Sequence, residues 1–576
     1  MPTEKKMTGY PSIDKPWLKY YPPELLSARP SFNSILDRIK MVWQNPNETI
    51  INYYDTEIKA KDFFEQVERV AKSLVAMGIK KGDAIVASLE CVPEYIELLF
   101  ACEKIGCCIK NLIDDIDNII NLINNDKTTR LYIAPNYISE SNTSNIYDKT
   151  NIKNIITIDP LFSLGKGLTL RSHIAKCIDS KYCNDISKNP NNISWGEFLE
   201  KGKENDSYEQ NKDNTIRLVS AFTSGSTGKP KELMHSSKSI LEMINQLSLS
   251  PYISGERELW LHTVIPTFIV AIIIAAICYP LADGKTLALD PYCEIEDLDL
   301  ELMYYKPSGW VLVPQFVNVL IESNRIPENY DMSHFKMFGF GAEPLTKKYI
   351  EKVQKFLDQH NYKGSLSAGY GQSEGGSGFT VAYGKEMILS GSAGMPYIDT
   401  VLSIFEPNTT NELKYYEVGE ICKSGAGIMI GYTDEKLTHE VLKIHPDGEL
   451  WLHTGDTGFM TPEGLLFVLG RKGLKIYPDK MVFPLSIENK ILTINGIKDA
   501  IIVSGTDKEH EGYETPYLFV VLENKQNEEM LICELNNYIK TMPIEEQPKK
   551  IFVIDKKPIS RFKTDRNSLQ KTYNLL

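Results

Sequence analysis

The chain has 576 residues, of which 42 % are hydrophobic and 24 % are charged, as in a globular protein with more than one core. This composition excludes a disordered or a collagen-like chain. Its 63 basic and 76 acidic residues give a net charge of −13, which argues against nucleic acid as a partner.

The ten cysteines are scattered along the chain, and none of them forms a Cys-x-x-Cys motif. We therefore expect free, buried thiols in a reducing compartment. The first ten residues lack the apolar stretch of a secretory signal. Together these features predict a cytoplasmic protein.

Short apolar runs alternate with helical stretches in the amino-terminal part. Residues 63–78 predict an amphipathic helix that ends at Gly78, residues 84–89 a strand, and residues 94–106 a second helix. Strands that alternate with helices predict an α/β fold, with a mostly parallel sheet covered on both faces. The stretch 184–214 is polar apart from an apolar island at residues 193–195 and 198–199, and it is expected to lie at the surface.

Residues 263–282 carry no charge and are long enough to span a bilayer. Pro266 and Pro280 leave about a dozen residues free of helix breakers, which is the length of a buried helix. No basic cluster flanks the segment. We expect a core helix beneath a sheet and no transmembrane span.

A loop rich in glycine and hydroxyl residues follows the buried strand predicted for residues 216–223. It consists of Thr223, Ser224, Gly225, Ser226, Thr227, Gly228, Lys229, Pro230 and Lys231. The backbone amides of such a loop turn toward an anion, and the lysines add positive charge. It is not a Walker loop, because Pro230 stands where Ser or Thr would bind magnesium. The pattern predicts a phosphate-binding loop.

A second motif, at residues 371–375, has the Gly-x-Ser-x-Gly pattern of a serine-hydrolase nucleophile elbow. His445 and His453 lie downstream as possible bases. However, an elbow opens into a helix, and the glycines after Ser373 are poor helix formers. A serine hydrolase acting through Ser373 stays open as a remote alternative.

The last hundred residues predict a compact unit of their own. Its strands are expected at residues 500–503, 518–522 and 551–554, and its helix at residues 528–539. We place the boundary in the basic, glycine-bearing stretch 470–473, which gives one domain of residues 1–470 and a second of residues 471–576.

Five motifs in order resemble those of the acyl-adenylate-forming superfamily, which includes acyl-CoA synthetases, aryl-CoA ligases and the adenylation domains of peptide synthetases. The phosphate loop is the first. The others are residues 341–345 as the adenine-side turn, 369–374 as the aromatic-Gly-x-Thr-Glu motif, 451–456 with Gly470-Arg471 as the ribose-binding pair, and 558–566 as the closing lysine motif. The resemblance extends from about residue 52 to the carboxy terminus and implies a large layered α/β domain and a small, mobile α+β domain.

The resemblance also implies ATP and Mg²⁺ as cofactors, and it assigns roles to residues. The loop 223–231 would hold the phosphates that leave as pyrophosphate. The catalytic residues would be Glu374 and Ser373, which bind Mg²⁺, and Lys563, which lies between the carboxylate and the α-phosphate. Gly341, Ala342, Glu343, Tyr370 and Gly371 would surround adenine. Asp456 would accept from both ribose hydroxyls, and Arg471 would support the ribose or a phosphate.

Three positions depart from the superfamily pattern. The hinge at residues 472–476 is shortened, and Gly473 would supply its flexibility. Asp479 replaces a glycine that commonly lines the pantetheine path, which bears on the thioester step more than on adenylation. Phe562 replaces the glycine that usually precedes the closing lysine.

The candidate substrate pocket is apolar, which predicts an acid with an aryl or aliphatic body. Its expected lining is Phe268, Ile269, Trp310, Phe338 and Phe340. Ile269 stands where aryl and acyl ligases often have a histidine. No aspartate occurs in residues 265–270 to hold an α-ammonium group, so amino acids are disfavoured as substrates.

The function expected from these motifs is an ATP-dependent acid–thiol ligase that forms an acyl-AMP and transfers the acyl group to coenzyme A. The alternative acceptor within the class is the phosphopantetheine of a carrier protein. No carrier domain follows in this sequence, so we expect any acyl or peptidyl carrier protein to be separate. A non-catalytic nucleotide-binding relative is a further alternative.

Overall fold

The structure is a computed structural model, and it describes residues 7–26, 32–182, 185–205, 207–223, 231–249, 257–341, 345–383, 387–388, 391–471, 473–524, 526, 528–560 and 563–575. For Glu204, Thr223, Phe340 and Ser365 it describes only the backbone.

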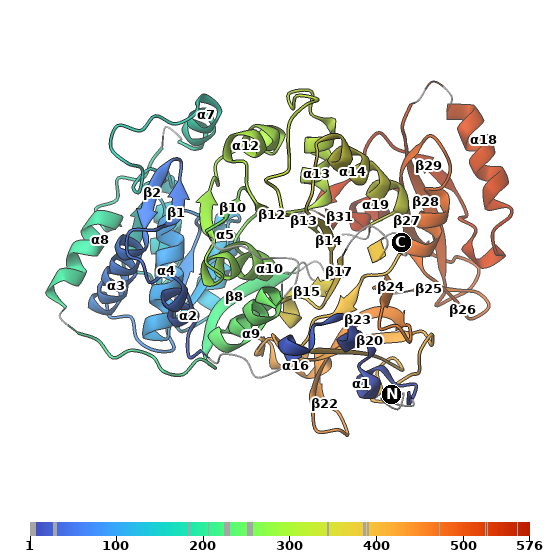
Figure 1. Ribbon diagram of the computed structural model, residues 1–576, viewed down its shortest axis with the longest axis horizontal. Helices are drawn as coiled ribbons and strands as arrows, with labels where there is room; N and C mark the ends of the chain where they lie inside the picture. Colours follow the sequence, from blue (N-terminus) through green and yellow to red (C-terminus); the bar gives the residue numbers. More distant parts are fainter. Residues whose placement is uncertain are drawn as a thin grey trace.

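Two large mixed sheets form the amino-terminal part of the molecule (Figure 1). The first has the order β18 (Met395–Pro396), β17 (Thr380–Tyr383), β14 (Ser365–Ala368), β13 (Met337–Phe340), β12 (Gly309–Leu312), β10 (Leu259–His262), β11 (Thr286–Leu289), β1 (Thr49–Tyr53), β2 (Thr56–Lys59). The second has the order β21 (Gly431–Tyr432), β9 (Lys231–Ser236), β8 (Arg217–Thr223), β4 (Cys108–Asn111), β3 (Ala84–Ala87), β5 (Thr129–Pro135), β6 (Ile155–Ile158), β7 (Asn192–Ser194). The central strands of both sheets pair in parallel, as expected.

Helices cover and separate these sheets, and one buried cluster joins side chains from both of them. The helices of this part are α1 (Pro11–Asp14), α2 (Ile35–Val42), α3 (Ala60–Ala76), α4 (Pro93–Ile105), α5 (Ile116–Asn125), α6 (Glu140–Lys149), α7 (Ser172–Lys181), α8 (Trp195–Lys201), α9 (Ser237–Ser248), α12 (Leu298–Tyr305), α13 (Pro314–Glu322) and α14 (Lys347–Gln359). In α3, Phe63, Val67, Val70 and Leu74 form the buried face at helical spacing, as the sequence pattern predicts. The strand and helix predicted next are β3 and α4.

The uncharged segment forms a buried, irregular helix beneath the first sheet, as predicted. It consists of α10 (Val270–Ile272), the π-helix η4 (Ile273–Cys278) and α11 (Tyr279–Ala282). Within the described ranges, no helix combines the length and the apolar character needed to cross a membrane. The polar stretch that begins at residue 184 includes α8, whose Trp195 and Phe198 are buried in the core.

A third, antiparallel sheet has the order β19 (Thr400–Phe405), β20 (Gly419–Gly425), β23 (Leu450–Met460), β22 (Leu442–Ile444), with β24 (Leu466–Gly470) also paired to β23. Helix α16 (Glu435–Val441) precedes β22. Two short strands, β15 (Gly371–Gln372) and β16 (Ser377–Gly378), enclose the turn η6 (Ser373–Gly375).

The carboxy-terminal elements, coloured orange to red in Figure 1, form an α+β unit with its own buried clusters. They are β25 (Leu474–Ile476), β26 (Lys480–Val482), α17 (Pro484–Ile491), β27 (Ile497–Thr506), β28 (Glu514–Leu522), α18 (Glu528–Ile539), β29 (Ile551–Val553), β30 (Ile559–Ser560), β31 (Lys563–Thr564) and α19 (Arg566–Thr572). The three strands and the helix predicted here are β27, β28, β29 and α18. The division at residues 470–473 remains a prediction.

One expectation about the cysteines needs correction. Eight of those described are buried, but Cys533 is exposed on α18. That helix buries Leu531 and Leu535 on its opposite side, so Cys533 falls on the solvent face. Cys183 lies outside the described residues.

Candidate active site

The predicted phosphate loop connects two neighbouring antiparallel strands. Thr223 at the end of β8 pairs with Lys231 at the start of β9. The ends of the loop are therefore side by side in the second sheet. Ser224, Gly225, Ser226, Thr227, Gly228 and Lys229 lie outside the described residues.

Tyr432 links the end of this loop to Glu374. The ring centroid of Tyr432 lies 5.5 Å from Lys231 Nζ, and its hydroxyl donates to Glu374 Oε1 at 2.5 Å. Burial and the neighbouring carboxylate raise the pKa of Tyr432, so the hydroxyl keeps its proton and remains a donor. Sequence analysis missed Tyr432, because only the pairing of β21 with β9 brings it to this place.

Glu374 fits the role of a magnesium ligand. It lies in η6, its side chain is only 6 % exposed, and carboxylate oxygen is the donor type that Mg²⁺ prefers. Close backbone approach positions this turn, since a Cβ at Gly371 would lie 1.8 Å from Ser377 O.

Asp456, on β23, is the centre of a second group of polar side chains. Its Oδ2 accepts from Tyr370 Oη at 2.7 Å and from Gln372 Nε2 at 2.5 Å, and Arg471 Nε lies 3.6 Å from Oδ1. Burial raises the pKa of Asp456, and the Tyr370 hydroxyl opposes this effect. A carboxylate accepts about four hydrogen bonds, so Oδ1 has capacity for further hydroxyl donors.

The predicted adenine-side turn begins beside this group. Gly341 follows β13, and a Cβ placed on it would lie 3.5 Å from Gly369 O. Tyr370 is half-buried, with its ring edge-on to Phe379 at 5.4 Å. Ala342 and Glu343 lie outside the described residues.

The predicted pocket residues fall in two environments. Phe268 and Ile269 are half-buried, just before α10, which contacts β16 next to the Glu374 turn. Trp310 and Phe338 are fully buried in the large core cluster, on β12 and β13. The side chain of Phe340 is not described.

The closing lysine and Asp479 lie in the carboxy-terminal unit. Lys563 is exposed and pairs with Ser560 in the β30–β31 hairpin, whereas Phe562 lies outside the described residues. Asp479 accepts from Tyr513 Oη at 2.8 Å and lies 3.2 Å from Lys475 Nζ. The Lys475 ammonium group thus balances the charge of Asp479.

One contact between this unit and the rest of the chain is made by α14, the helix that follows the predicted adenine-side turn. Lys348, on α14, donates to Ile497 O at 3.0 Å and pairs with Glu523 at 2.6 Å.

The geometry around Ser373 does not form a hydrolase site. The 3₁₀ turn η6 leads into β16, where an elbow would open into a helix. His235 binds the Ser373 carbonyl oxygen, and His445 and His453 bind each other at 2.9 Å in the third sheet. The serine-hydrolase alternative therefore has no support from the structure.

Glu420, Cys422 and His453 form a separate cluster, with donor atoms within 4.8 Å of one another. His453 Nδ1 contacts Glu420 at 2.9 Å, and its Nε2 contacts His445. Both ring nitrogens are engaged, so a metal ion would have to replace one of these hydrogen bonds. The Gly455 amide donates to Glu420 at 3.0 Å, so the cluster also anchors the turn before Asp456.

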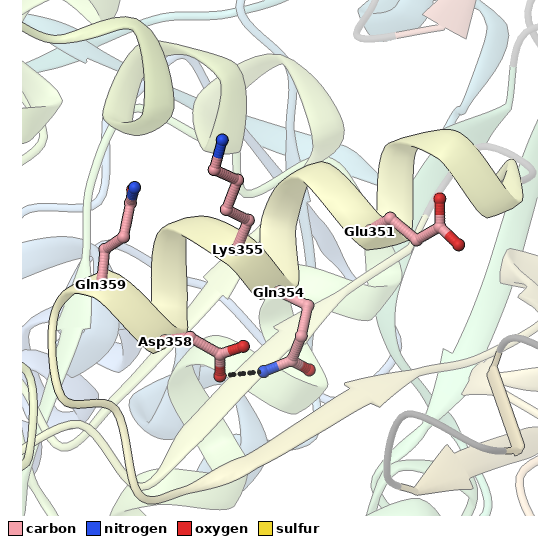
Figure 2. Close-up of a pocket in the computed structure, with 5 residues that line it drawn as sticks. All are labelled: Glu351, Gln354, Lys355, Asp358 and Gln359. Carbon is pink, nitrogen blue, oxygen red and sulfur yellow. Dashed lines mark hydrogen bonds between the residues drawn. The ribbon is translucent and has the colours of Figure 1, made fainter.

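A surface hollow on α14 is unrelated to these groups (Figure 2). Figure 2 shows five polar side chains of that one helix around it, Glu351, Gln354, Lys355, Asp358 and Gln359, with Gln354 donating to Asp358 at 2.8 Å. These side chains belong to the solvent face of α14 and bring no catalytic set together.

Comparison with known proteins gives consistent matches. A family model described as AMP-binding enzyme matches residues 40–433. The chain is 28 % identical over 469 residues to the probable CoA ligase CCL5 of Humulus lupulus, covering 80 % of this chain and 78 % of that protein. It is 27 % identical over 496 residues to 4-coumarate–CoA ligase of Vanilla planifolia, covering 83 % of this chain and 81 % of that protein.

Solved structures share the fold over nearly the whole chain. The o-succinylbenzoate CoA synthetase of Bacillus subtilis, in complex with its acyl-adenylate intermediate, has a TM-score of 0.71 at 20 % identity and covers 94 % of this chain and 98 % of that one. An anthranilate CoA ligase in complex with anthranoyl-AMP has a TM-score of 0.76 at 16 % identity, covering 96 % and 99 %. The expected architecture, a large α/β part with a small α+β part, is confirmed.

Proposed function

Because this chain belongs to the AMP-binding enzyme family, we propose that it joins a carboxylic acid to the thiol of coenzyme A through an acyl adenylate. It is an adenylate-forming enzyme of the AMP-forming acid–CoA ligase type. The observation that supports the proposal is the contact chain from Lys231 through Tyr432 to Glu374, which joins the end of the predicted phosphate loop to the carboxylate that we propose as the Mg²⁺ ligand.

The first half-reaction brings two anions together, the carboxylate of the acid and the α-phosphate of ATP. Its barrier is mainly electrostatic, so positive charge placed in advance accelerates it. Lys231 and the loop before it would bind the phosphates that leave. Mg²⁺ held by Glu374 would neutralise charge on the phosphate oxygens.

Asp456 would orient the nucleotide. Its Oδ2 is occupied by Tyr370 and Gln372, so the ribose hydroxyls would donate to Oδ1 beside Arg471. Lys563 would contact the substrate carboxylate and the α-phosphate when the carboxy-terminal unit turns toward the site. A second orientation of that unit, about residues 470–473, would admit the thiol.

The relatives support coenzyme A as the acceptor, since the two matched by sequence, from Humulus lupulus and Vanilla planifolia, are CoA ligases by name. The half-buried, apolar Phe268 and Ile269, which directly precede the helix α10 that contacts β16, support an acid with an aryl or aliphatic body. A separate carrier protein remains the alternative acceptor.

The direct test is acid-dependent exchange of labelled pyrophosphate into ATP, with a panel of aryl, short-chain, medium-chain and long-chain acids and without any thiol. We expect exchange with one class of acid, and that acid should then yield a thioester when coenzyme A is added. Exchange driven only by amino acids would contradict the apolar pocket. Nucleotide binding without exchange for any acid would identify a non-catalytic relative.

Glu374→Gln should increase the Mg²⁺ concentration needed for half-maximal exchange by at least about 10- to 100-fold, since that is the cost of losing even a residue that only supports a metal ligand. The variant keeps the side-chain size but loses the negative charge. Titration of exchange activity with MgCl₂ at saturating ATP measures the effect. Tyr432→Phe is the matched control, because it removes only the hydroxyl that orients Oε1 and should cause a smaller shift. An unchanged Mg²⁺ dependence in Glu374→Gln would contradict this assignment.

A further inference from the structure

The turn that carries Glu374 is held by hydrogen bonds to three successive carbonyl groups. The carbonyl oxygens of Ser373, Glu374 and Gly375 accept, in that order, from His235 Nε2 at 2.8 Å, Met429 N at 2.9 Å and Lys423 Nζ at 2.7 Å. The donors come from β9, from the loop after β20 and from β20 itself. The position of the turn is therefore set by tertiary contacts.

Lys423 is the unusual member of this set, because it is a fully buried lysine. Its Nζ also donates to Ala426 O at 2.6 Å and lies 4.8 Å from the ring centroid of Phe379. In the described part of the chain, no carboxylate lies within ion-pair distance of Nζ. Burial lowers the pKa of Lys423 to about 7.

Burying an amine with no carboxylate at ion-pair distance is costly, and its hydrogen bonds, together with the more distant charge of Glu242, offset this cost. Both of these hydrogen bonds end on backbone that holds Glu374. Gly375, whose carbonyl oxygen accepts one of them, directly follows Glu374 in the chain. Ala426, whose carbonyl oxygen accepts the other, begins the segment 426–429, and the amide of Met429 in that segment donates to Glu374 O. Lys423 thus connects the two backbone segments on either side of the Glu374 carbonyl.

We propose that Lys423 is a positioning residue, which holds the Glu374 turn where the carboxylate meets the metal bound with ATP. The proposal rests on the proposed function, because it takes Glu374 as the Mg²⁺ ligand. Lys423 itself touches neither substrate nor metal, and it acts through the backbone of residues 374–375.

The variant Lys423→Met tests this role, since it keeps an unbranched apolar stem and removes the N–H donors. We expect the Mg²⁺ concentration for half-maximal pyrophosphate exchange, and the KM for ATP, to rise about tenfold, as for other residues that support a metal ligand. The KM for the acid should stay within twofold. Calorimetric titration of the full chain with ATP, in the presence and absence of Mg²⁺, gives a second readout that needs no acid.

Leu402→Ala is the matched control. Leu402 pairs with Lys423 across β19 and β20, and it belongs to the same buried cluster as Phe379. Its apolar side chain cannot donate a hydrogen bond to the Glu374 turn, so this variant should lower the Tm and leave the Mg²⁺ dependence unchanged. Unchanged Mg²⁺ and ATP constants in a folded Lys423→Met protein would overturn the proposal.

A double-mutant cycle shows whether Lys423 affects Mg²⁺ binding through Glu374 or through a general destabilisation of the site. In a Glu374→Gln background, Lys423→Met should add less than a threefold further shift in Mg²⁺ dependence. A full, multiplicative tenfold shift would overturn the proposal. Lys423→Gln is the second variant, and if both Lys423 variants fail to fold while Leu402→Ala folds, Lys423 is a residue of the fold and the proposal fails. Absence of exchange in the unaltered chain would instead count against the proposed function.

Discussion

Lys563→Ala is expected to slow adenylation by about 10²- to 10³-fold, the usual effect of removing one group that stabilises charge in a transition state. Transfer of the acyl group from preformed acyl adenylate to coenzyme A should stay within about threefold, because the proposed role of the ammonium ends once pyrophosphate has left. Pyrophosphate exchange measures the first half-reaction, and thioester formation from synthetic acyl adenylate measures the second.

The control for this experiment is Lys571→Ala. Lys571 is exposed in α19, close in sequence to the β30–β31 hairpin, and its loss removes the same charge from the same unit. Its exchange rate should be unchanged. Equal loss of both half-reactions in Lys563→Ala would contradict the assignment of Lys563 to the adenylation step.

Much of the fold could be predicted from the sequence because its signals are local. Helix α3 shows its buried face as a spacing of apolar residues, and β3 shows its burial as an unbroken apolar run. The buried helix at residues 270–282 was predicted by its length and its two prolines. Its π-helical centre was not, because that depends on packing beneath the sheet.

The contacts that shape the candidate site are long-range, and no local pattern indicates them. Tyr432 reaches Glu374 only because β21 pairs with β9 at the edge of the second sheet. The sequence does not single out Lys423, because its hydrogen bond to Gly375 O depends on how β20 lies relative to η6. For Tyr370 the sequence predicted only an aromatic face for adenine. It did not predict that the hydroxyl group donates to Asp456.

Asp456→Ala should raise the KM for ATP by at least about 10²-fold, because each hydrogen bond to a charged group contributes about 1.5–3 kcal/mol and the ribose has two hydroxyls to place. The KM for the acid should change little, since Asp456 belongs to the group around Tyr370 and Gln372 and not to the region of Phe268. Initial rates of exchange at varied ATP and varied acid separate the two constants.

The variant Tyr370→Phe tests whether the effect of Asp456→Ala comes from the carboxylate itself or from the tyrosine hydroxyl that binds it. It removes the hydroxyl that binds Oδ2 at 2.7 Å but keeps the ring, its packing on Phe379 and the carboxylate. If Asp456 binds the ribose through Oδ1, Tyr370→Phe removes only the hydrogen bond that orients the carboxylate. The KM of this variant for ATP should then rise less than tenfold. A larger effect in Tyr370→Phe than in Asp456→Ala would place the nucleotide contact on the tyrosine. In that case Asp456 would serve to hold Tyr370, and the roles of the two residues would be exchanged.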